Sequence, residues 1–490
     1  MTLRAGWIKV KEVSEVPAGA IDDGVGKDET PGTVGDALKI SSEACGIGLQ
    51  IEFLNSHTPT MGLGDPERKT VLDSEKMKLF FQEQRKKVQN SGLALKDVRV
   101  IDLGAVVAAP FAATMLGDFG AEVIKVEPRE VPDAIRLWNV VEGKYQPYWL
   151  VNSRNKLPIT LNLKHPQGQK ILRQLVERAD VLLENMRPGT LDRLGFSSQE
   201  LWKINKGLVI GRISGYGQTG PYSAKPGFGT LAEAMSGYSH LNTHPGQPPT
   251  SPPLPLADMI TGLHLALGVM VALRRQKRGV EGGQEIDLSL YEPLLSMLGP
   301  EYLYYSLTGN IPEPLGNEAA FAAPRNSFKT GDGKWVALSA TAQAPCERMM
   351  DLVGHSELKT KPGFRNNSER IHPESRRVLN QVIGDWIRSK SQKEVIAECE
   401  KAGVTIGPVY NMEEISRDPH VKERGSIGAV PDPVTGKTLS FPRNPIRVHP
   451  VSPEIRFPGL PMGAANDFVL EDLLGYTPEE VASMKAEKVI

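Results

Sequence analysis

The sequence predicts an α/β fold: a large domain built on a parallel, Rossmann-like sheet, and a second, smaller α/β domain. Between about residues 98 and 213, short apolar runs alternate with segments of helical periodicity, and Gly, Asp or Asn separates them. This alternation is typical of βαβ units, whose strands are parallel. The chain has 490 residues, which is more than one core usually holds, so more than one domain is expected.

The large domain is expected to begin at residue 95 and to run, in its first part, to residue 310. Short runs rich in Val, Ile and Leu predict its strands. They cover residues 98–103, 121–126, 181–183, 208–213 and 285–290. The helices are predicted at 110–116, 171–179 and 197–204, and from about 259 onward. The last contains the longest apolar stretch, residues 260–273, which is too short to span a bilayer and predicts a buried helix.

Three further segments complete the predicted organisation. Residues 311–415 form the smaller α/β domain, because a strand pattern at 334–338 is followed by helical patterns up to 402. Residues 416–490 are expected to return to the large domain and to end in a short helix. Residues 1–94 are an N-terminal extension of unknown role, in which only residues 75–89 show a helical pattern.

Composition excludes several classes of function. Lys and Arg number 57 against 58 Asp and Glu, so the chain lacks the basic excess of a nucleic-acid-binding protein. The 48 glycines and 38 prolines show no fixed period and indicate many loops. Cys45, Cys346 and Cys399 form no CxxC pair, which favours a reduced, cytoplasmic location. No secretory signal or membrane span is expected, and the nine histidines lack metal-ligand spacing, so no metal site is expected.

Residues Gly215–Gly220 match the GxGxxG pattern and follow a predicted strand. A dinucleotide site would need a helix that opens directly from this loop and an acidic residue about 20 positions later. Pro221 and Pro226 interrupt such a helix, and no strand ends in an acidic residue at that distance. The motif is therefore expected to be a turn whose backbone amides can approach a ligand.

Short motifs rich in glycine and charged residues recur in a fixed order between residues 101 and 258. They are Ile101–Gly104 with Ala108–Pro110, Leu116–Pro128, Asn155–Lys164, Glu184–Gly189 with Leu191–Gly195, Ser214–Pro221, Lys225–Gly227 with Ala234–Gly237, and Ala257–Asp258. In order and spacing this series resembles the family III CoA-transferases, the CaiB/BaiF type, over about residues 95–490. The resemblance implies an interlocked homodimer, in which each chain threads the ring formed by the other.

Asp258 is the catalytic residue that this resemblance implies. Its carboxylate would attack an acyl-CoA thioester, and the reaction would need no metal and no permanently bound cofactor, because coenzyme A enters as substrate. The position suits an anion, since Asp258 adjoins the start of a long helix, where free N–H groups and the helix dipole favour negative charge. Without the surrounding motifs, an ordinary helix-capping aspartate would be the better interpretation.

The resemblance also implies which residues contact coenzyme A. They are Val107, Ala108, Leu161, Lys164, Asn185, Met186, Arg187, Arg193, Lys225 and Phe228. Because the net charge is close to zero, local cations such as Arg187 and Arg193 are expected to meet the phosphates. Trp138 and Gly229 are assigned to the substrate pocket, Trp138 because formyl- and oxalate-handling members place a tryptophan there.

Departures from the family pattern limit the substrate. Val107 stands where oxalate and formate members have a glutamine, and Gly229 stands where they have an acidic residue. Their glycine-rich lid is replaced by Glu318–Ala323. Oxalate and formate are therefore disfavoured, and a carboxylic acid acceptor with a dicarboxylate donor such as succinyl-CoA is expected from family breadth.

Two other functions remain open from the sequence. Related acyl-CoA racemases place a histidine in the loop at Gly227–Gly229, and this chain has none there, which disfavours a racemase or isomerase. A catalytically silent, CoA-binding partner subunit of a heteromer is the other alternative, and the presence of Asp258 argues against it. No nucleic acid or membrane partner is expected.

Overall fold

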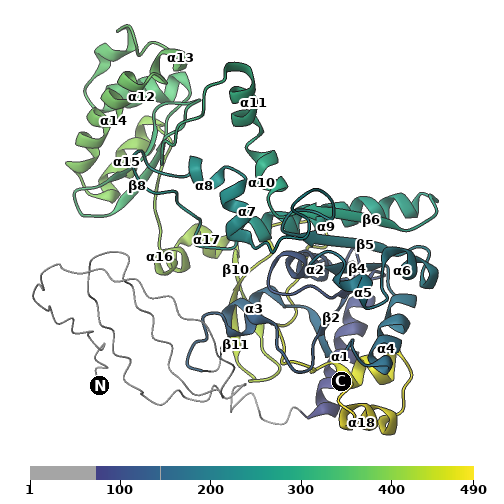
Figure 1. Ribbon diagram of the computed structural model, residues 1–490. Coiled ribbons are helices and arrows are strands. Elements are labelled where there is room, and N and C mark those ends of the chain that lie inside the picture. The colour runs from purple at the N-terminus through teal and green to yellow at the C-terminus, as the bar shows by residue number, and fades with distance from the viewer. Residues whose placement is uncertain (1–72, 144) are drawn as a thin grey trace, which may run out of the picture. The chain divides into compact units, whose positions relative to one another are not determined.

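The computed structural model describes residues 73–143 and 145–490, and a six-stranded parallel sheet is its central element (Figure 1). The strands are β1 (Arg99–Asp102), β2 (Glu122–Glu127), β3 (Lys156–Thr160), β4 (Val181–Glu184), β5 (Val209–Ser214) and β6 (Gln284–Ser289). Their order is β3-β2-β1-β4-β5-β6. Successive strands are added on one side of β1 as far as β3 and on its other side from β4 to β6, so the strand order reverses between β1 and β4. In such sheets ligands bind in the crevice at that point, beyond the carboxyl ends of the strands.

The α/β class and the parallel sheet are confirmed. The strands predicted from apolar runs are present, because parallel strands that are covered on both faces are apolar throughout. Sequence analysis did not predict β3, in which Lys156 and Thr160 are both buried and Pro158 interrupts the apolar run. These polar side chains find partners inside the protein, since Lys156 pairs with Asp102 and Thr160 bonds with Asn466.

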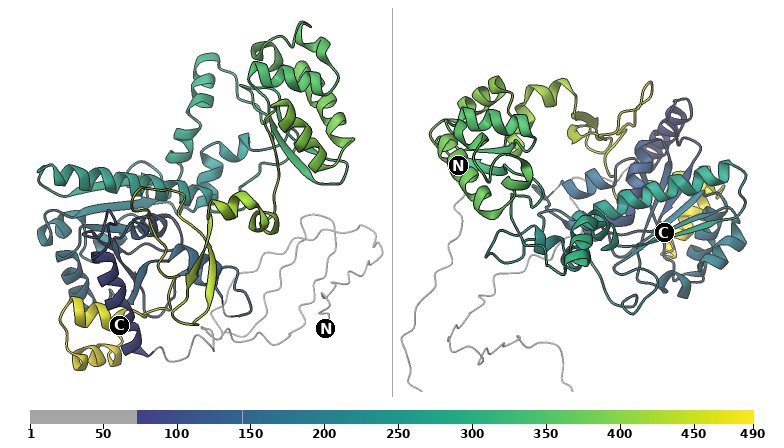
Figure 2. Two further views of the ribbon diagram at one scale, coloured as in Figure 1. Left: turned by 180° about the vertical axis from the view of Figure 1, so that it is seen from behind. Right: turned by 90° about the horizontal axis from the view of Figure 1, so that it is seen from above.

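Helices cover both faces of the sheet. On one face, α2 (Ala108–Asp118) and α9 (Leu256–Lys277) pack on side chains such as Val100, Val123 and Val209. On the other face, α4 (Pro166–Glu177) and α6 (Ser198–Ile204) pack on Ile101 and Ile210. Both views of Figure 2 show α9 lying alongside the edge strand β6.

Helix α9 is longer than the sequence indicates. It spans 22 residues, and by length and composition alone it could cross a membrane. About a third of its apolar window is buried, including Leu265 and Val269, which lie in the core of the sheet domain. Its closest neighbour is α2, because residue 262 is glycine: a Cβ there would lie 2.7 Å from the carbonyl oxygen of Ala108. The helix is therefore a core helix with one uncovered side.

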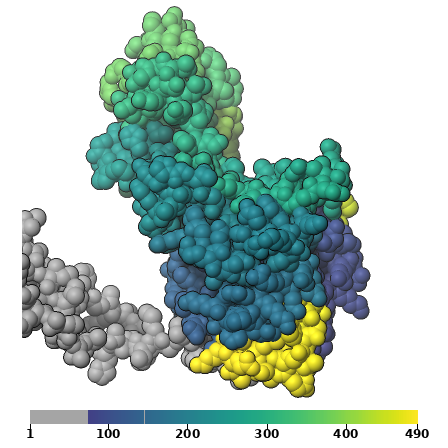
Figure 3. Space-filling view, turned by 45° about the vertical axis from the view of Figure 1, so that its right-hand side comes forward, coloured from purple at the N-terminus to yellow at the C-terminus, as the bar shows by residue number. Residues whose placement is uncertain are grey.

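Two segments near the ends of the described chain complete the core. Helix α1 (Ser74–Gln89), which lies within the predicted extension, inserts Met77 and Phe81 into it. The π-helix η3 (Phe468–Leu473) contributes Phe468 to the same core, and α18 (Pro478–Ala486) follows it. In Figure 3 the C-terminal residues, in yellow, lie directly against the blue surface of the sheet domain. Lys78 of α1 also forms an ion pair with Glu471 of η3, with Nζ and Oε2 2.6 Å apart.

The smaller α/β unit has its own antiparallel sheet and its own core. Its strands are β7 (Arg325–Lys329), β8 (Trp335–Ser339) and β9 (Ile406–Pro408), and its main helices are α12 (Gln343–Leu352), α14 (Pro373–Arg388) and α15 (Gln392–Ala402). Cys346 and Cys399 are free thiols in this core, whereas Cys45 lies outside the described residues. Helices α10 (Glu292–Met297) and α11 (Gly299–Thr308) lead into the unit. The hairpin β10–β11 (Ile427–Pro431 and Thr438–Pro442) follows it.

Candidate active site

Asp258 lies in the first turn of α9. The helix begins at Leu256, directly after Pro255, so Asp258 is inside the helix and is not its cap as its position before the apolar run suggested. The fixed φ angle of proline favours this early start. The first turn is also where the helix dipole stabilises an anion, so the electrostatic reason for placing a carboxylate here still holds.

The start of α7 (Gly229–Met235) presses against the Asp258 side chain. A Cβ at residue 229 would lie only 2.0 Å from Asp258 Oδ2, so the carboxylate occupies the space that a side chain would need. One turn further along α7, Glu233 Oε1 accepts a hydrogen bond of 3.2 Å from the backbone N–H of Ala257. Helix α7 thus fixes both the room around Asp258 and the backbone beside it.

The electrostatic surroundings raise the pKa of Asp258. Burial raises this pKa to about 6, and the neighbouring Glu233 contributes in the same direction. Within the described part of the chain, no Lys, Arg or His forms an ion pair with Asp258. At neutral pH the group is therefore mainly a carboxylate without a countercharge, and such a carboxylate can act as a nucleophile.

The glycine loop after β5 packs against the segment that leads into α7. Gly215 and Gly227 touch backbone to backbone, and a Cβ at residue 215 would lie 2.6 Å from the Gly227 Cα. The GxGxxG segment forms a turn, and the next helix starts only at residue 229. It therefore lacks the helix that a dinucleotide site requires and instead brings residues 227–229 to the carboxyl edge of the sheet.

Two side chains from other parts of the chain, Asn185 and Asp133, form hydrogen bonds with the loop between β1 and α2. Asn185, at the end of β4, accepts a hydrogen bond of 2.7 Å from the Ala105 N–H and donates one of 2.8 Å to the Ala105 carbonyl. The Val106 N–H donates to the Asp133 carboxylate at 2.9 Å. Val106 has φ of 63°, a left-handed conformation that is rare for a β-branched residue. These bonds keep the loop in a strained conformation at the crevice.

Buried ion pairs lie directly beneath this loop. Lys125 of β2 pairs with Asp133 at 3.2 Å and donates to the Gly104 carbonyl. Lys156 of β3 pairs with Asp102 of β1 at 2.8 Å and donates to the Pro110 carbonyl at 2.7 Å. Burial lowers the pKa of Lys156 to about 8, so this lysine is still charged at neutral pH. Each ammonium group thus binds a carboxylate and a backbone carbonyl near the start of α2.

Trp138 belongs to an aromatic cluster beside Asp258. Its ring contacts Tyr148 edge to face, with centroids 5.4 Å apart, and Met259, the residue that follows Asp258, packs against the same buried cluster. Val107 is fully buried in the same cluster. The structure therefore brings Val107 and Trp138, two residues of the predicted site, close to the start of α9.

A cavity of about 600 Å³ opens at the carboxyl ends of β1, β2 and β4. Half of the predicted coenzyme A contacts line it, namely Leu161, Lys164, Asn185, Met186 and Arg193. Arg129 is a cation of this lining that sequence analysis did not identify, and Lys125, Glu127 and Asp133 also line it. A lysine within an otherwise apolar strand, as at residue 125, is the sequence signal that could have revealed the buried pair.

The cavity, its cations and the nearby carboxylate carry the features expected of a CoA-transferase. The model of CoA-transferase family III matches residues 95–466. The chain belongs to this family. The succinyl-CoA–D-citramalate CoA-transferase of Chloroflexus aurantiacus is 37% identical to this CoA-transferase over 397 residues, which are 81% of this chain and 98% of the relative.

Further similarities agree with this family. The beta subunit of the succinyl-CoA–L-malate CoA-transferase of the same organism is 35% identical over 401 residues, 81% of this chain and 98% of the relative. Among solved structures, a CAIB/BAIF family protein from Brucella suis superposes with a TM-score of 0.65 at 28% identity, covering 80% of this chain and 98% of that one. The predicted family, fold and enzyme class are therefore confirmed.

The other predicted contacts of this CoA-transferase do not line the cavity. Arg187 is exposed outside it, and Val107 and Ala108 are buried. Lys225 lies over the Tyr222 ring, with Nζ 3.5 Å from the centroid, and the Phe228 side chain is 68% exposed. Lys225 and Phe228 belong to the loop that leads into α7, on the side of Asp258.

Proposed function

We propose that this CoA-transferase works through covalent intermediates on Asp258. The observation that carries the proposal is the unpaired carboxylate of Asp258 at the start of α9, held against Gly229. A carboxylate is a weak nucleophile when it is solvated or tied to a cation, and Asp258 is half-buried without a cation partner among the described residues. Its raised pKa also increases its basicity while leaving it mainly ionised at pH 7.

The proposed reaction balances without any further reagent. An oxygen of Asp258 attacks the thioester carbon of the donor, the C–S bond breaks, and an aspartyl-acyl anhydride and the CoA thiolate result. The thiolate then attacks the aspartyl carbonyl, which releases the donor acid as a carboxylate and leaves an aspartyl-CoA thioester. The acceptor carboxylate attacks this thioester, the C–S bond breaks, and a second aspartyl-acyl anhydride and the CoA thiolate result. The thiolate then attacks the acceptor's acyl carbon and expels the Asp258 carboxylate. The products are the new acyl-CoA and free Asp258.

We propose that the cavity at the carboxyl ends of β1, β2 and β4 receives the nucleotide part of coenzyme A. Arg129, Lys164 and Arg193 supply cations at its wall, where phosphate groups need charged donors. Its volume of about 600 Å³ is suited to part of such a ligand. The loop at Ala105 and Val106, fixed by Asn185 and Asp133, lies between this cavity and α9 and gives the pantetheine arm a rigid border.

For the substrates, we propose succinyl-CoA as donor and a dicarboxylate, such as citramalate or malate, as acceptor. The support is the activity of two relatives, which are named as CoA-transferases that use succinyl-CoA with these acids. The residues of the site agree, because Val107 and Gly229 lack the polar groups that oxalate and formate enzymes present. The two free, buried cysteines are consistent with the cytoplasmic location that we also propose.

A second chain is proposed to complete the enzyme, as an interlocked homodimer. Helix α11 has no buried residue although it carries Tyr302, Leu303 and Leu307, and α9 exposes Leu267 and Val271. Exposed apolar surface of this kind is typical of an interface. Native mass spectrometry tests this proposal: a species of twice the 53.5 kDa chain mass supports it, and a monomer at micromolar concentration would contradict it. A relative that is a named beta subunit makes co-purification of a different chain the alternative outcome.

Trapping of the intermediate tests the mechanism. The protein is incubated with succinyl-CoA and hydroxylamine, and the peptide that contains Asp258 is weighed. A hydroxamate on Asp258 is expected, because hydroxylamine cleaves both the anhydride and the thioester. The Asp258→Asn variant should lose about 10⁴-fold or more in transfer rate. Asp180→Asn is the matched control, since Asp180 is another half-buried carboxylate with a raised pKa, at the opposite edge of the sheet. Full activity of Asp258→Asn would exclude the mechanism.

A further inference from the structure

A second cavity lies at the opposite edge of the same sheet, where the strands begin. It has a volume of about 480 Å³, and we call it the amino-edge cavity. The residues just before or at the starts of β1, β2 and β3 form its floor, and α1 and η3 cover it. Helix α1 and η3 lie outside residues 95–466, the part of the chain that the family model matches.

Cations outnumber anions around the amino-edge cavity. Its basic lining residues are Arg85, Lys96, Arg99, Arg178 and Arg456, and its acidic ones are Asp97, Glu122 and Asp180. Asp97 is already paired with Lys277, at 3.1 Å. Glu122 forms ion pairs with two of the arginines, Arg85 and Arg99. Among the lining residues, cations therefore exceed anions by two, five against three.

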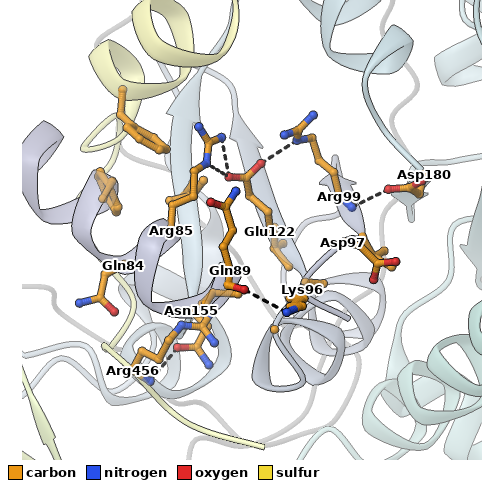
Figure 4. Close-up of a pocket in the computed structure, with 18 of the residues that line it drawn as sticks. Gln84, Arg85, Gln89, Lys96, Asp97, Arg99, Glu122, Asn155, Asp180 and Arg456 are labelled. Carbon is orange, nitrogen blue, oxygen red and sulfur yellow. Dashed lines mark hydrogen bonds and ion pairs between the residues drawn. The ribbon is translucent and has the colours of Figure 1, made fainter. Parts of the chain in front are cut away.

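Arg85 and Arg99 flank the Glu122 carboxylate, as Figure 4 shows. Arg85 Nε donates to one oxygen and Arg99 Nε donates to the other, both at 2.6 Å. Arg99 uses Nη1 for the carbonyl of Arg178, at 2.9 Å, which leaves its Nη2 for another acceptor. Because a guanidinium carries five N–H donors and no acceptor, one shared carboxylate cannot satisfy two of them.

Arg456 is the most incompletely bonded of these cations. Its Nη1 donates to the Gly117 carbonyl at 3.2 Å, but its Nε is buried and has no acceptor among the described residues. Burial lowers the pKa of Arg456, although the carboxylates of Asp118 and Glu454 act in the opposite direction. Asn155 lies beside it in Figure 4 and uses its side-chain oxygen for the Arg456 backbone N–H. A buried guanidinium with open donors at a cavity wall requires an acceptor.

We propose that the amino-edge cavity binds a compact oxyanion, a phosphate or carboxylate group of a small molecule, through Arg456 and through the guanidinium nitrogens of Arg85 and Arg99 that Glu122 and the Arg178 carbonyl do not occupy. Arginine is suited to both groups, because its planar fork binds two oxygens at once. The lining is mainly polar, so the ligand is small and charged. The site lies at the amino edge of the sheet, whereas Asp258 and the coenzyme A cavity lie at the carboxyl edge, so the two bind independently.

Equilibrium dialysis of the full chain with radiolabelled inorganic phosphate, and separately with radiolabelled succinate, tests the proposal. The wild type should bind one of these anions, and Arg456→Gln should weaken that binding by at least about tenfold. Arg348→Gln is the matched control, because Arg348 also donates to a single backbone carbonyl, that of Gly403, in the smaller unit. Arg193→Gln monitors anion binding at the carboxyl edge. Both control variants should leave the Arg456-dependent binding unchanged.

A second pair of variants tests the proposal even if the Arg456→Gln protein does not fold. Gln84 of α1 lines the cavity, so Gln84→Glu should weaken anion binding and Gln84→Lys should strengthen it. Phosphate and succinate distinguish the two sources of the oxyanion. The proposal is overturned if neither anion binds up to about 10 mM. It is also overturned if binding is lost in Arg193→Gln but kept in Arg456→Gln, or if both Gln84 variants bind as the wild type does.

Discussion

The two edges of the central sheet use charged residues in different ways. Toward the carboxyl edge, the ammonium groups of Lys125 and Lys156 are each paired with a carboxylate and also bind a backbone carbonyl; the Lys156 side chain reaches from the first residue of β3 to Asp102 at the end of β1. At the amino edge, Arg85 and Arg99 share Glu122, and Arg456 keeps an open donor. The first arrangement is complete and fixes the backbone, and the second is incomplete and faces a cavity.

This difference indicates what each edge does. Buried charges that are fully paired hold a strained loop in position, and here that loop borders the cavity proposed for coenzyme A. Cations that lack partners indicate a ligand that the protein does not itself supply. A charged residue near a pocket is therefore informative only when its partners are known.

Loss of a buried partner at the carboxyl edge should have the largest effect. Lys156→Met leaves Asp102 buried without its cation, and the free energy of unfolding should fall by about 3–5 kcal/mol. Urea denaturation measures this loss. Lys96→Met at the amino edge, where the lysine is exposed and binds two carbonyls, should cost less than about 1 kcal/mol. Equal losses of unfolding free energy in Lys156→Met and Lys96→Met would contradict the difference between the two edges.

The next largest effect is expected at the contact between α7 and Asp258. Gly229→Ala places a methyl group where the Asp258 carboxylate lies, so kcat should fall by about 10²-fold or more while the melting temperature changes little. Gly299→Ala is the control, because a Cβ there meets open space. Steady-state kinetics and thermal melts of both variants measure kcat and the melting temperature and so test this prediction. A Gly229→Ala enzyme with normal kcat would show that Asp258 need not occupy its observed position.

A tenfold effect is expected at the wall of the coenzyme A cavity. Arg193→Gln should raise KM for succinyl-CoA about tenfold and leave kcat nearly unchanged, because one cation near a phosphate is lost. Arg187→Gln should have little effect, since Arg187 is exposed outside the cavity. A similar rise in KM for both variants would mean that Arg187 also meets the ligand.

The smallest effect is a shift in pH dependence. Protonation of Asp258 removes the nucleophile, so kcat/KM should decline as the pH falls through about 6. Glu233→Gln removes the negative charge that helps to raise this pKa, and the decline should move to lower pH. Glu301→Gln on α11 serves as control and should leave the profile in place. A shift to higher pH in Glu233→Gln would contradict the assigned electrostatics.

The sequence was sufficient to predict most of the sheet but not its charged interior. Strands with continuous apolar runs, such as β4 and β5, were predicted because burial on both faces selects such residues. Strand β3 was missed because its buried Lys156 is compatible with burial only in the presence of Asp102, 54 positions earlier. Strands β7, β10 and β11 were missed as well, since they pair in small antiparallel sheets with many exposed side chains.

The candidate site shows the same limit. The roles proposed for Asp258 and for the residues of the cavity, which stay predictions, were inferred from the order of the motifs along the chain. Glu233, Asp133 and Arg129 were not, because their roles depend on contacts between segments that are distant in sequence. The surface position of Arg187 likewise depends on how the chain turns after β4, which neither composition nor spacing specifies.

The contact at Gly262 has a consequence for the shape of the active site. Asp258 lies one helical turn before Gly262, and Gly262 lets α9 approach the first residue of α2 at backbone distance. The missing methyl group therefore sets how far apart the starts of the two helices are. A larger residue here would push α2 and α9 apart and widen the space around Asp258 without altering any residue that contacts substrate. The width of this site is determined inside the protein, at a position that no substrate reaches.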